Sequence, residues 1–399
     1  MHGGVSAAFA DAAAFDGLRQ EWDTLWGTSR SRTLFLSWEW LHSWWRHWRE
    51  GRLLRLVLVR DSGGTLVGIA PLCIERRGPL RGTRVLAFLG TEGVSSDYLD
   101  FLASESHEAQ VAAAVFALIA QDSASWDLIE LSDLLETSLV LRHIATCARD
   151  AGLIARRSPD QICPFLTLPQ TPEQLAGVLG KRTRAHVGKK RRRLLHAGIS
   201  IRLIENREEL PRALASLFDI HEQRWRLRAL PGNFRQDRIR AFHSEVAPLF
   251  LGRGWLRLFE ASREGTVVAI LYGFQDDTTL TYFQSGFLPE FSRYSPGGVL
   301  IGEGMEYAIR HGGGRFDFLR GPEPYKWEWT SESRTTHRLT LVRRGDLPTR
   351  IRMGVTRLGD TGKRLVKAIL RPSKRTRAWR GAGSEEEGEG RIQPASDAP

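Results

Sequence analysis

The chain has few cysteines and no long apolar run, which excludes several classes of protein. Its 399 residues include only three cysteines, Cys73, Cys147 and Cys163, which stand far apart. No two of them have the close spacing of zinc ligands, and three scattered thiols make no disulfide framework. A disulfide framework and a structural zinc site are therefore both excluded, and we expect the protein to work in a reduced, cytoplasmic setting.

Long apolar runs are also missing. The longest, Val111–Ala120, falls well short of the roughly 20 residues that a membrane span needs. The N-terminus has no positively charged start, and Asp11 interrupts its apolar stretch, so it does not match a signal peptide. The short motifs of nucleotide hydrolysis, dinucleotide redox chemistry, zinc proteolysis and serine hydrolysis are absent as well.

Positive charge is concentrated in one place. Lysine and arginine number 57 against 46 acidic residues, which gives a net charge of +11. Eight of these cations, with no acid among them, lie between Lys181 and Arg193, and 11 − 8 leaves only +3 for the rest. The basicity is a local feature, which argues against a general nucleic-acid coat. The composition is that of a globular protein, and the length predicts two domains.

Strands alternate with helices along the chain, which predicts a layered fold around central sheets. The predicted helices are Asp11–Thr28, Leu36–Arg49, Glu108–Gln121, Thr137–Ala151, Lys181–Ala197, Glu208–Leu230, Gln236–Leu251 and Pro296–His311. The predicted strands are a hairpin over Leu54–Ile74, Arg84–Leu89, Trp126–Leu131, Leu153–Arg157, Ser200–Ile204, a hairpin over Trp255–Phe274, Thr278–Ser285, Phe316–Leu319 and His337–Arg343. A basic amphipathic helix over 347–370 and a disordered tail over 371–399 complete the prediction.

The pattern occurs twice. GTLVGI at 64–69 matches GTVVAI at 265–270, and Trp126–Ile129 matches Phe316–Leu319 in the same order along the chain. Two copies of one structural unit explain both matches, although apolar alternation around a glycine turn is common enough to imitate the first.

One helix is apolar over most of its girth. Trp38, Leu41, Trp45 and Trp48 recur at helical spacing between Leu36 and Arg49. Such a cluster can form an aromatic platform for sugars, but the spacing favours a helix buried between a sheet and a neighbouring domain.

A second helix has an opening that suits an anion. Pro296 stands at its start with Gly297 and Gly298 behind it, and Arg293 lies just upstream. Bare amides and the positive end of the helix dipole suit a diphosphate, to which the arginine adds a two-pronged contact. An ordinary capped helix with a surface arginine is the alternative.

Several longer stretches resemble a known family. They are FLSWEWLHSWW (35–45), VGIAPL (67–72), LGTEGVSSDYLDFL (89–102), KKRRRLLHAG (189–198), FDIHEQRW (218–225) and FDFLRGPEPYKWEW (316–329). Together they resemble the CelD-like proteins of the GNAT acyltransferase superfamily, which are relatives of the FemAB peptidoglycan aminoacyltransferases.

The resemblance implies an α+β fold of two tandem GNAT-like domains, with mixed central sheets flanked by helices. A degenerate copy would span 1–170, and an acetyltransferase-like copy would span 171–346. Acetyl-CoA or another acyl-CoA is the implied donor, with no metal. The diphosphate would bind at Arg293, Pro296, Gly297 and Gly298, although the family's glycine pattern is shifted here by one position. The thioester would lie along backbone amides of one strand. Those amides belong to Tyr282, Phe283, Gln284 and Ser285.

The reaction also needs a proton acceptor. His221 and Glu222 in FDIHEQRW are candidates, because histidine titrates near neutrality and burial tunes a glutamate upward. Asp317 is a third candidate, although a carboxylate in an apolar strand more often fixes a loop or pairs with Arg320 or Lys326. The alternative for the histidine and glutamate is a solvated or interface pair.

Two further features suit a substrate. Tyr325 and Lys326, with Trp327 and Trp329, follow a strand end and fit a sugar or phosphate-bearing acceptor, or else they cover a domain interface. The basic helix could contact CoA or tRNA phosphates, lie on anionic lipid as a peripheral contact, or remain a solvated face.

The sequence therefore predicts an acyltransferase acting on an amino or hydroxyl group of a saccharide or cell-envelope precursor. Aminoacyl transfer from charged tRNA and an inactive basic adaptor in polysaccharide synthesis are the alternatives.

Overall fold

The computed structural model describes residues 4–78, 82–226 and 233–345. The predicted helix over 347–370 and the predicted tail over 371–399 lie outside the described residues, as does the end of the helix predicted over Glu208–Leu230. All the described residues belong to one compact unit that extends to Gly345.

The N-terminal half, defined here as β1 to α5, contains two groups of strands and five α-helices among the described residues. Its elements are β1 (Ser6–Ala10), α1 (Ala12–Gly17), α2 (Arg19–Thr28), α3 (Trp38–Trp48), β2 (Leu53–Leu54), β3 (Leu56–Arg60), β4 (Leu66–Ala70), β5 (Leu72–Arg77), β6 (Thr83–Phe88), β7 (Leu102–Ala103), α4 (Glu108–Gln121), β8 (Leu128–Leu134) and α5 (Leu139–Asp150). The prediction gave the bounds of α4 correctly, but it missed β1 and joined α1 to α2 across Leu18.

The C-terminal half, defined as α6 to β14, carries the basic helix. Its elements are α6 (Pro172–Val178), α7 (Lys181–Ala185), a π-helical turn (His186–Lys190), α8 (Arg191–His196), β10 (Ser200–Leu203), α9 (Leu210–Arg226), α10 (Asp237–Gly252), β11 (Leu256–Arg263), β12 (Thr266–Gln275), β13 (Thr279–Phe287), α11 (Pro296–Arg310) and β14 (Arg315–Asp317). The prediction missed α6. Gly198 has a φ of 74° directly after the basic helix, which is the left-handed ending expected there.

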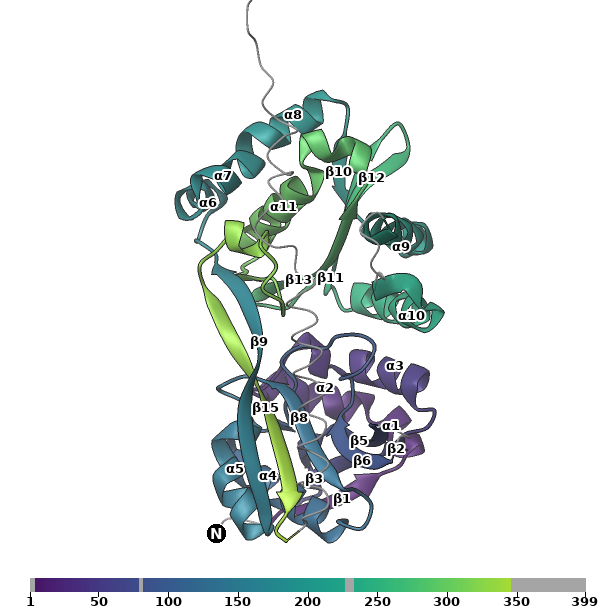
Figure 1. Ribbon diagram of the computed structural model, residues 1–399, viewed down its shortest axis with the longest axis vertical. Helices are drawn as coiled ribbons and strands as arrows, with labels where there is room; N and C mark the ends of the chain where they lie inside the picture. The colour runs from purple at the N-terminus through teal and green to yellow at the C-terminus, as the bar shows by residue number, and fades with distance from the viewer. Residues whose placement is uncertain (1–3, 79–81, 227–232, 346–399) are drawn as a thin grey trace, which may run out of the picture. The chain divides into compact units, whose positions relative to one another are not determined.

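Two long strands, β9 (Leu153–Thr167) and β15 (Ser333–Arg343), join the halves. β9 pairs with β14 of the C-terminal half, and β15 pairs with both β9 and β8 of the N-terminal half. The result is a continuous mixed sheet in the order β10-β11-β12-β13-β14-β9-β15-β8-β6-β5-β2 (Figure 1). The sheet runs across the predicted boundary near residue 170, which stays a prediction.

The prediction ended β9 at Arg157, ten residues too early. Pro159 and Pro164 interrupt the expected alternation, and proline inside a strand normally argues against that strand. Pro164 pairs in register with Ser333 of β15, and a register shift between Thr335 and His337 lies next to Pro159. At the shift, the backbone N–H of Gln161 donates to Thr336 Oγ1 at 3.1 Å in place of a ladder bond.

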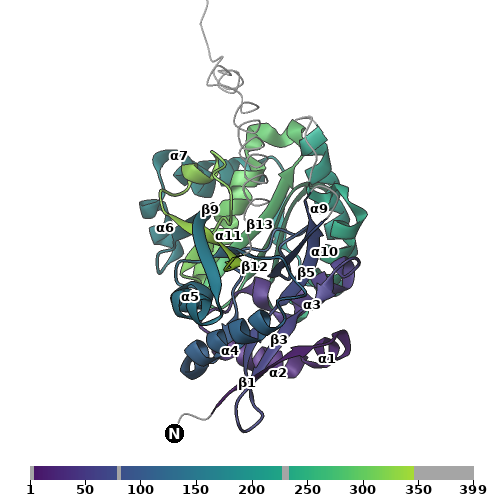
Figure 2. The same ribbon diagram turned by 60° about the horizontal axis from the view of Figure 1, so that its bottom comes forward.

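A smaller sheet in the order β1-β3-β4-β7 completes the N-terminal half. α4 packs on β1, β3 and β4, as Figure 2 shows where this half comes forward. Gly68 of β4 permits this close approach, because a Cβ there would lie 2.5 Å from a methyl carbon of Val111.

The internal repeat is visible in the pairing. β3–β4 and β11–β12 are both antiparallel hairpins. β6 and β8 then pair in parallel on either side of α4, as β13 and β14 do on either side of α11. Strand, helix and parallel strand therefore recur in the same order in both halves.

The tryptophan-rich helix lies inside the molecule, as its periodicity favoured. Ser37 caps α3 by accepting from the Trp40 backbone N–H, and Trp40 is fully buried. The Trp40 ring contacts Phe242 of α10 at 4.9 Å and Phe283 of β13 at 5.7 Å between centroids. α3 is thus part of the core shared by the two halves rather than an exposed sugar platform.

Candidate functional site

The first turn of α11 starts from a left-handed residue. Ser295 has a φ of 52° and makes no side-chain cap, and Pro296 follows it without an N–H. Gly297 and Gly298 are only half-buried. The first amides of an α-helix have no partner within the helix, and they carry its positive dipole. The predicted proline–glycine start of the helix is therefore present, with its two glycines half-buried.

The basic helix packs directly against this turn. A Cβ on Gly298 would lie 2.2 Å from Nδ1 of His186, and one on Gly302 would lie 3.2 Å from a methyl carbon of Val187. Arg191 forms an ion pair with Glu303 one turn farther along α11. Glycine at 298 is thus required by the imidazole that lies on it. The π-helical turn places His186 and Lys190 together on this inner side.

His186 brings a buried donor to the start of α11. Its side chain is 9% exposed, and Lys190 Nζ lies 3.3 Å from Nε2. Burial, with a smaller effect of Lys190, lowers the pKa of His186 to about 4, so the ring is neutral near pH 7. A neutral imidazole that accepts at Nε2 carries its proton on Nδ1. Within the described part of the chain, Nδ1 has no hydrogen-bond partner.

Two arginines lie near the ring of Tyr294, in the turn that precedes α11. The guanidinium carbon of Arg293 is 4.8 Å from the centroid of the Tyr294 ring, and that of Arg193 is 5.9 Å from it. Arg193 was not predicted here, because it is a hundred residues away in the chain. An exposed cation pair, a buried N–H and helix amides together form a cradle for a phosphate-bearing group.

β13 and β14 separate next to this cradle. They pair only from Thr279 with Arg315 to Thr281 with Asp317. β13 continues to Phe287 on β12 alone, with a bulge opposite Tyr272 and Gly273. Beyond Thr281, the edge of β13 that faces β14 has no strand partner among the described residues. The four predicted residues from Tyr282 to Ser285 lie in this stretch.

Their side chains go to different places. The Tyr282 hydroxyl is hydrogen-bonded to the Ser285 hydroxyl, and both residues are buried. Phe283 points into the shared aromatic core, at 5.2 Å from His243 between centroids, while Gln284 is half-buried. The side chains of this stretch therefore do not form one surface, but its backbone groups lie along one edge of β13. A thioester would contact these backbone groups.

Asp317 ties the two halves together. It is fully buried and accepts hydrogen bonds from Tyr98 Oη at 2.9 and 3.1 Å and from the Leu319 backbone N–H at 2.8 Å. Its ion-pair partner is Arg334 of β15. The expected pairing with Arg320 or Lys326 is wrong, because both of those side chains have other partners. A carboxylate with this many donors is held in place rather than poised to take a proton.

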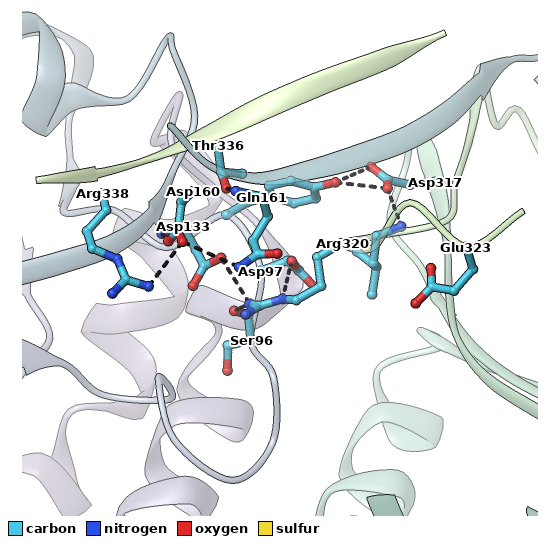
Figure 3. A network of polar contacts seen from close by, with 12 residues as sticks. Ser96, Asp97, Asp133, Asp160, Gln161, Asp317, Arg320, Glu323, Thr336 and Arg338 are labelled. Carbon is cyan, nitrogen blue, oxygen red and sulfur yellow. Dashed lines mark hydrogen bonds and ion pairs between the residues drawn. The ribbon is translucent and has the colours of Figure 1, made fainter. Parts of the chain in front are cut away.

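Arg320 lies in an acidic network at the same junction. Its guanidinium pairs with Asp97 at 2.7 Å and with Asp133 at 3.2 Å, and Figure 3 shows Asp160 and Arg338 extending the network. Burial raises the pKa of Asp97 despite its ion pair, and it raises the pKa of Asp133 to about 7. The carboxyl group of Asp133 is therefore only partly ionised near neutral pH.

The backbone around this junction is strained. Four residues other than glycine have a positive φ there: Ser95 (51°), Tyr98 (57°), Asp133 (61°) and Leu319 (56°). Such conformations cost about 1–3 kcal/mol each and persist where the surroundings require them. The predicted motif LGTEGVSSDYLDFL therefore builds the junction. Its acids inside an apolar run were the only signal of this role.

A third acid of that motif, Asp100, caps α5. It is 3% exposed and accepts from the backbone N–H groups of Leu139 at 2.6 Å and Val140 at 3.1 Å, and from Ser31 Oγ at 2.7 Å. Burial raises its pKa to about 6, although these donors favour the charged form.

The aromatic loop after β14 folds around Lys326. This side chain is 4% exposed, and Nζ donates to the Arg320 carbonyl at 2.7 Å and pairs with Glu323 at 2.9 Å. Tyr325 lies 6.4 Å from Tyr282 between ring centroids, which places the loop beside the separating strands. Trp329 packs on His186 at 5.5 Å, and Trp327 is 38% exposed. Lys326 thus holds the loop, and Tyr325 is the member nearest to β13.

His221 and Glu222 lie near the C-terminal end of α9, on β13. A Cβ on Gly286 of β13 would lie 3.2 Å from the His221 backbone nitrogen. His221 is 1% exposed and packs on Phe234 at 5.0 Å. Glu222 is 6% exposed, and its Oε1 has no hydrogen-bond partner in the described part of the chain. The expectation of a solvated pair is wrong, because both side chains are buried.

The described part of the chain, residues 4–78, 82–226 and 233–345, contains no group of three or more histidine, cysteine, aspartate or glutamate side chains that could hold a metal ion. None of the described helices is both long enough and apolar enough to cross a membrane.

The chain is similar to known proteins in one sequence segment and in its fold. Residues 181–327 match the model of the acetyltransferase (GNAT) domain family. FemX has a similar structure at 12% identity, with a TM-score of 0.60 over 84% of this chain and 96% of FemX. A conserved protein of unknown function from Bacteroides thetaiotaomicron is 12% identical, with a TM-score of 0.52 over 85% of this chain and all of that one. No curated protein matches.

At this low identity the structural likenesses concern the fold, and they confirm the predicted α+β class with mixed sheets over most of the chain. The basic helix, α11 and the aromatic loop all lie within the matched segment. The predicted resemblance to the CelD-like GNAT proteins is thereby confirmed over residues 181–327, which match the acetyltransferase (GNAT) domain family.

Proposed function

We propose that the protein transfers an acyl group from acyl-CoA to an amino or hydroxyl group of a saccharide or cell-envelope precursor. The observation that carries the proposal is the cradle at the start of α11, next to the unpartnered edge of β13. Proteins of the GNAT superfamily typically use acyl-CoA, so the family match supports this donor.

In this proposal the CoA diphosphate accepts hydrogen bonds from the Gly297 and Gly298 amides. Nδ1–H of His186 and the guanidinium of Arg293 add donors from two sides. The helix dipole and the cations offset the charge of the diphosphate. The pantetheine arm and thioester then extend along the edge of β13 from Tyr282 to Ser285, whose free amides can polarise the carbonyl oxygen.

The reaction is a direct transfer. The nucleophilic nitrogen or oxygen of the acceptor attacks the thioester carbon, the carbon–sulfur bond breaks, and CoA leaves as the thiol or thiolate. The acceptor loses one proton, which a base must take. Holding both substrates in one site supplies much of the rate, because it makes the attack effectively intramolecular.

Glu222 is the proposed base, with His221 beside it. A buried carboxylate oxygen without a donor is costly for the fold, and a functional role explains why it is kept. α9 lies on the face of the sheet opposite α11, so an acceptor proton would reach Glu222 from the side away from the cradle. Asp317 and Lys326 are positioning residues in this scheme, because their polar atoms are engaged elsewhere.

Release of free thiol from acetyl-CoA in the presence of amino sugars and other candidate acceptors tests the proposal. Glu222→Gln is expected to lower the rate by about 100-fold while leaving CoA affinity unchanged. Glu208→Gln, at an exposed position just before α9, is the matched control. Equal rates for the Glu222 variant and wild type would remove Glu222 as the base, and absence of CoA binding would remove the donor.

A second candidate is aminoacyl transfer from charged tRNA. The similarity to the FemX fold and the acid-free basic helix favour it. Thermal stabilisation separates the two candidates: a rise in midpoint with acetyl-CoA but not with tRNA supports the first, and the reverse supports the second.

A further inference from the structure

The basic helix has one side that the candidate site does not use. Its inner side is anchored on α11 by His186, Val187 and Arg191, as described above. Its exposed cations are Lys181, Arg182, Arg184, Lys189, Arg192 and Arg193. From Gly180 to Gly198 the sequence contains no acidic residue, so the helix itself provides no counter-charge.

These exposed cations have almost no acidic partners. Within the described ranges the structure gives one ion pair among them, between Arg182 and Glu328, and it is long at 3.8 Å. Elsewhere on the surface, arginines such as Arg30 and Arg149 lie within 3.2 Å of a carboxylate. The outward side of α7 and α8 is thus a cationic strip whose charge is almost unneutralised.

Exposed apolar side chains lie around the same strip. The described chain has six large hydrophobic residues that are exposed. Three of them are Val178 of α6 (49%), Leu195 of α8 (41%) and Trp327 of the aromatic loop (38%). The contact between Arg182 and Glu328 brings Trp327 next to the start of α7. Half of the exposed large apolar residues therefore belong to the elements that carry or flank the cationic strip.

We propose that this surface, formed by α6, α7, α8 and Trp327, docks on an anionic lipid bilayer. Lysine and arginine would pair with lipid phosphates, and the three apolar side chains would enter the region between headgroups and acyl chains. The apolar face of the basic helix itself is occupied by α11, so the helix lies on the surface of the bilayer without entering it. Figure 1 shows α6, α7 and α8 at the outer side of the C-terminal half.

An anionic bilayer fits this surface better than an RNA does. The phosphates of either partner could bind the cations. An RNA backbone, however, offers no apolar layer for Val178 and Leu195, so polar residues would serve equally well at these two positions. The proposal can be tested separately from the acyl donor, because Lys189, Arg192, Val178 and Leu195 are not among the residues assigned to the CoA diphosphate. Arg193 alone belongs to both surfaces.

Sedimentation of the full chain with vesicles tests it. Wild type is expected to bind vesicles that contain phosphatidylglycerol, to bind pure phosphatidylcholine vesicles much more weakly, and to lose most binding at high salt. The variant Lys189→Gln/Arg192→Gln removes two cations of the strip and is expected to bind about 30-fold more weakly. Arg30→Gln/Arg149→Gln removes the same charge elsewhere and is expected to bind as wild type does.

A second variant tests the apolar part. Val178→Ser/Leu195→Ser keeps every charge and is expected to weaken vesicle binding several-fold. Its affinity for a double-stranded RNA should be unchanged. CoA affinity, measured alongside, should be the same in all variants. The proposal is overturned if wild type does not bind anionic vesicles, if the lysine–arginine variant binds them equally well, or if that variant loses RNA binding alone.

Discussion

The two halves use the same strand, helix and parallel strand, but their helices begin differently. α4 starts at Glu108, whose carboxylate is buried and bonded to Arg142, so the helix dipole meets a charge supplied by the protein. The hydrogen bond from Arg142 lowers the pKa of Glu108. α11 starts with Pro296, Gly297 and Gly298 and has no acid in its first turn. The first copy therefore neutralises its helix end with its own carboxylate, whereas the second has no acid in the corresponding first turn.

The loops before the two helices also differ: the first carries acids that bind other parts of the protein, and the second carries an exposed arginine. In the N-terminal half this loop carries Asp97, Tyr98 and Asp100, which are used in an ion pair, a hydrogen bond to Asp317 and a helix cap. In the C-terminal half it carries Arg293 at an exposed position. Asp97 and Tyr98 of the first copy thus contact and support the second copy, and the predictions below test each side of this comparison.

The largest effect is expected at the support. Asp317→Ala leaves the half-buried Arg334 charge and the buried Tyr98 hydroxyl without their partner, and it should lower the free energy of unfolding by about 3–5 kcal/mol. Denaturant unfolding measures this. Asp277→Ala, which removes an exposed carboxylate paired with Arg32, is the control and should change stability by less than about 1 kcal/mol. Similar losses for both variants would mean that the junction is not a support.

The cap of α5 should give a pH signature. Because the folded pKa of Asp100 is raised, its protonated form is favoured by folding, and the stability that it contributes is lost as pH rises from about 4 through about 6. Asp100→Asn lacks this titration. The difference in unfolding free energy between wild type and variant should therefore shrink by about 3 kcal/mol between pH 4 and pH 8. A difference independent of pH would contradict the assignment.

A carboxylate at the start of α11 should make that copy resemble the first. Gly298→Asp adds a negative charge to the cradle, and CoA affinity is expected to fall by about 100-fold. Because the new side chain also meets His186, the double variant Gly298→Asp/His186→Ala relieves the clash while keeping the charge. Gly27→Asp, in open space on α2, controls for charge alone. Unchanged CoA binding by the double variant would contradict the claim that the start of α11, unlike the start of α4, binds an anionic ligand.

A smaller effect is expected from Arg293. Arg293→Ala removes one charge-assisted contact at an exposed position and should weaken CoA about ten-fold without altering the thermal midpoint of the free protein. Arg263→Ala, at an exposed hairpin end, is the control. An unchanged affinity for CoA would show that the diphosphate does not bind next to Arg293.

Local sequence signals predicted the helices and hairpins well. The bounds of α4, the start of α11 at Pro296 and both repeated hairpins follow from apolar spacing, proline and glycine, which act within a few residues. β9 was cut short because its prolines depend on a bulge in β15, far along the chain. Pairing across large sequence separations leaves little trace in one sequence.

The site was predicted in part for the same reason. The glycines at 297 and 298 and Arg293 could be singled out, because they lie close together in the sequence, and their role in binding stays a prediction. His186, Tyr98 and Arg334 were missed, because each acquires its role from a partner more than ten residues away, and for Tyr98 and Asp317 the separation is 219 residues. Asp317 was singled out correctly as a buried acid but was given the wrong partners.

The most direct test compares the binding of CoA with that of pantetheine, which lacks the diphosphate, by calorimetric titration of the wild-type chain. If the start of α11 holds the diphosphate, CoA binds and pantetheine binds at least about 100-fold more weakly. Equal affinity for the two compounds, or no heat from either, would contradict the claim that this helix start is the part of the molecule left open for a ligand.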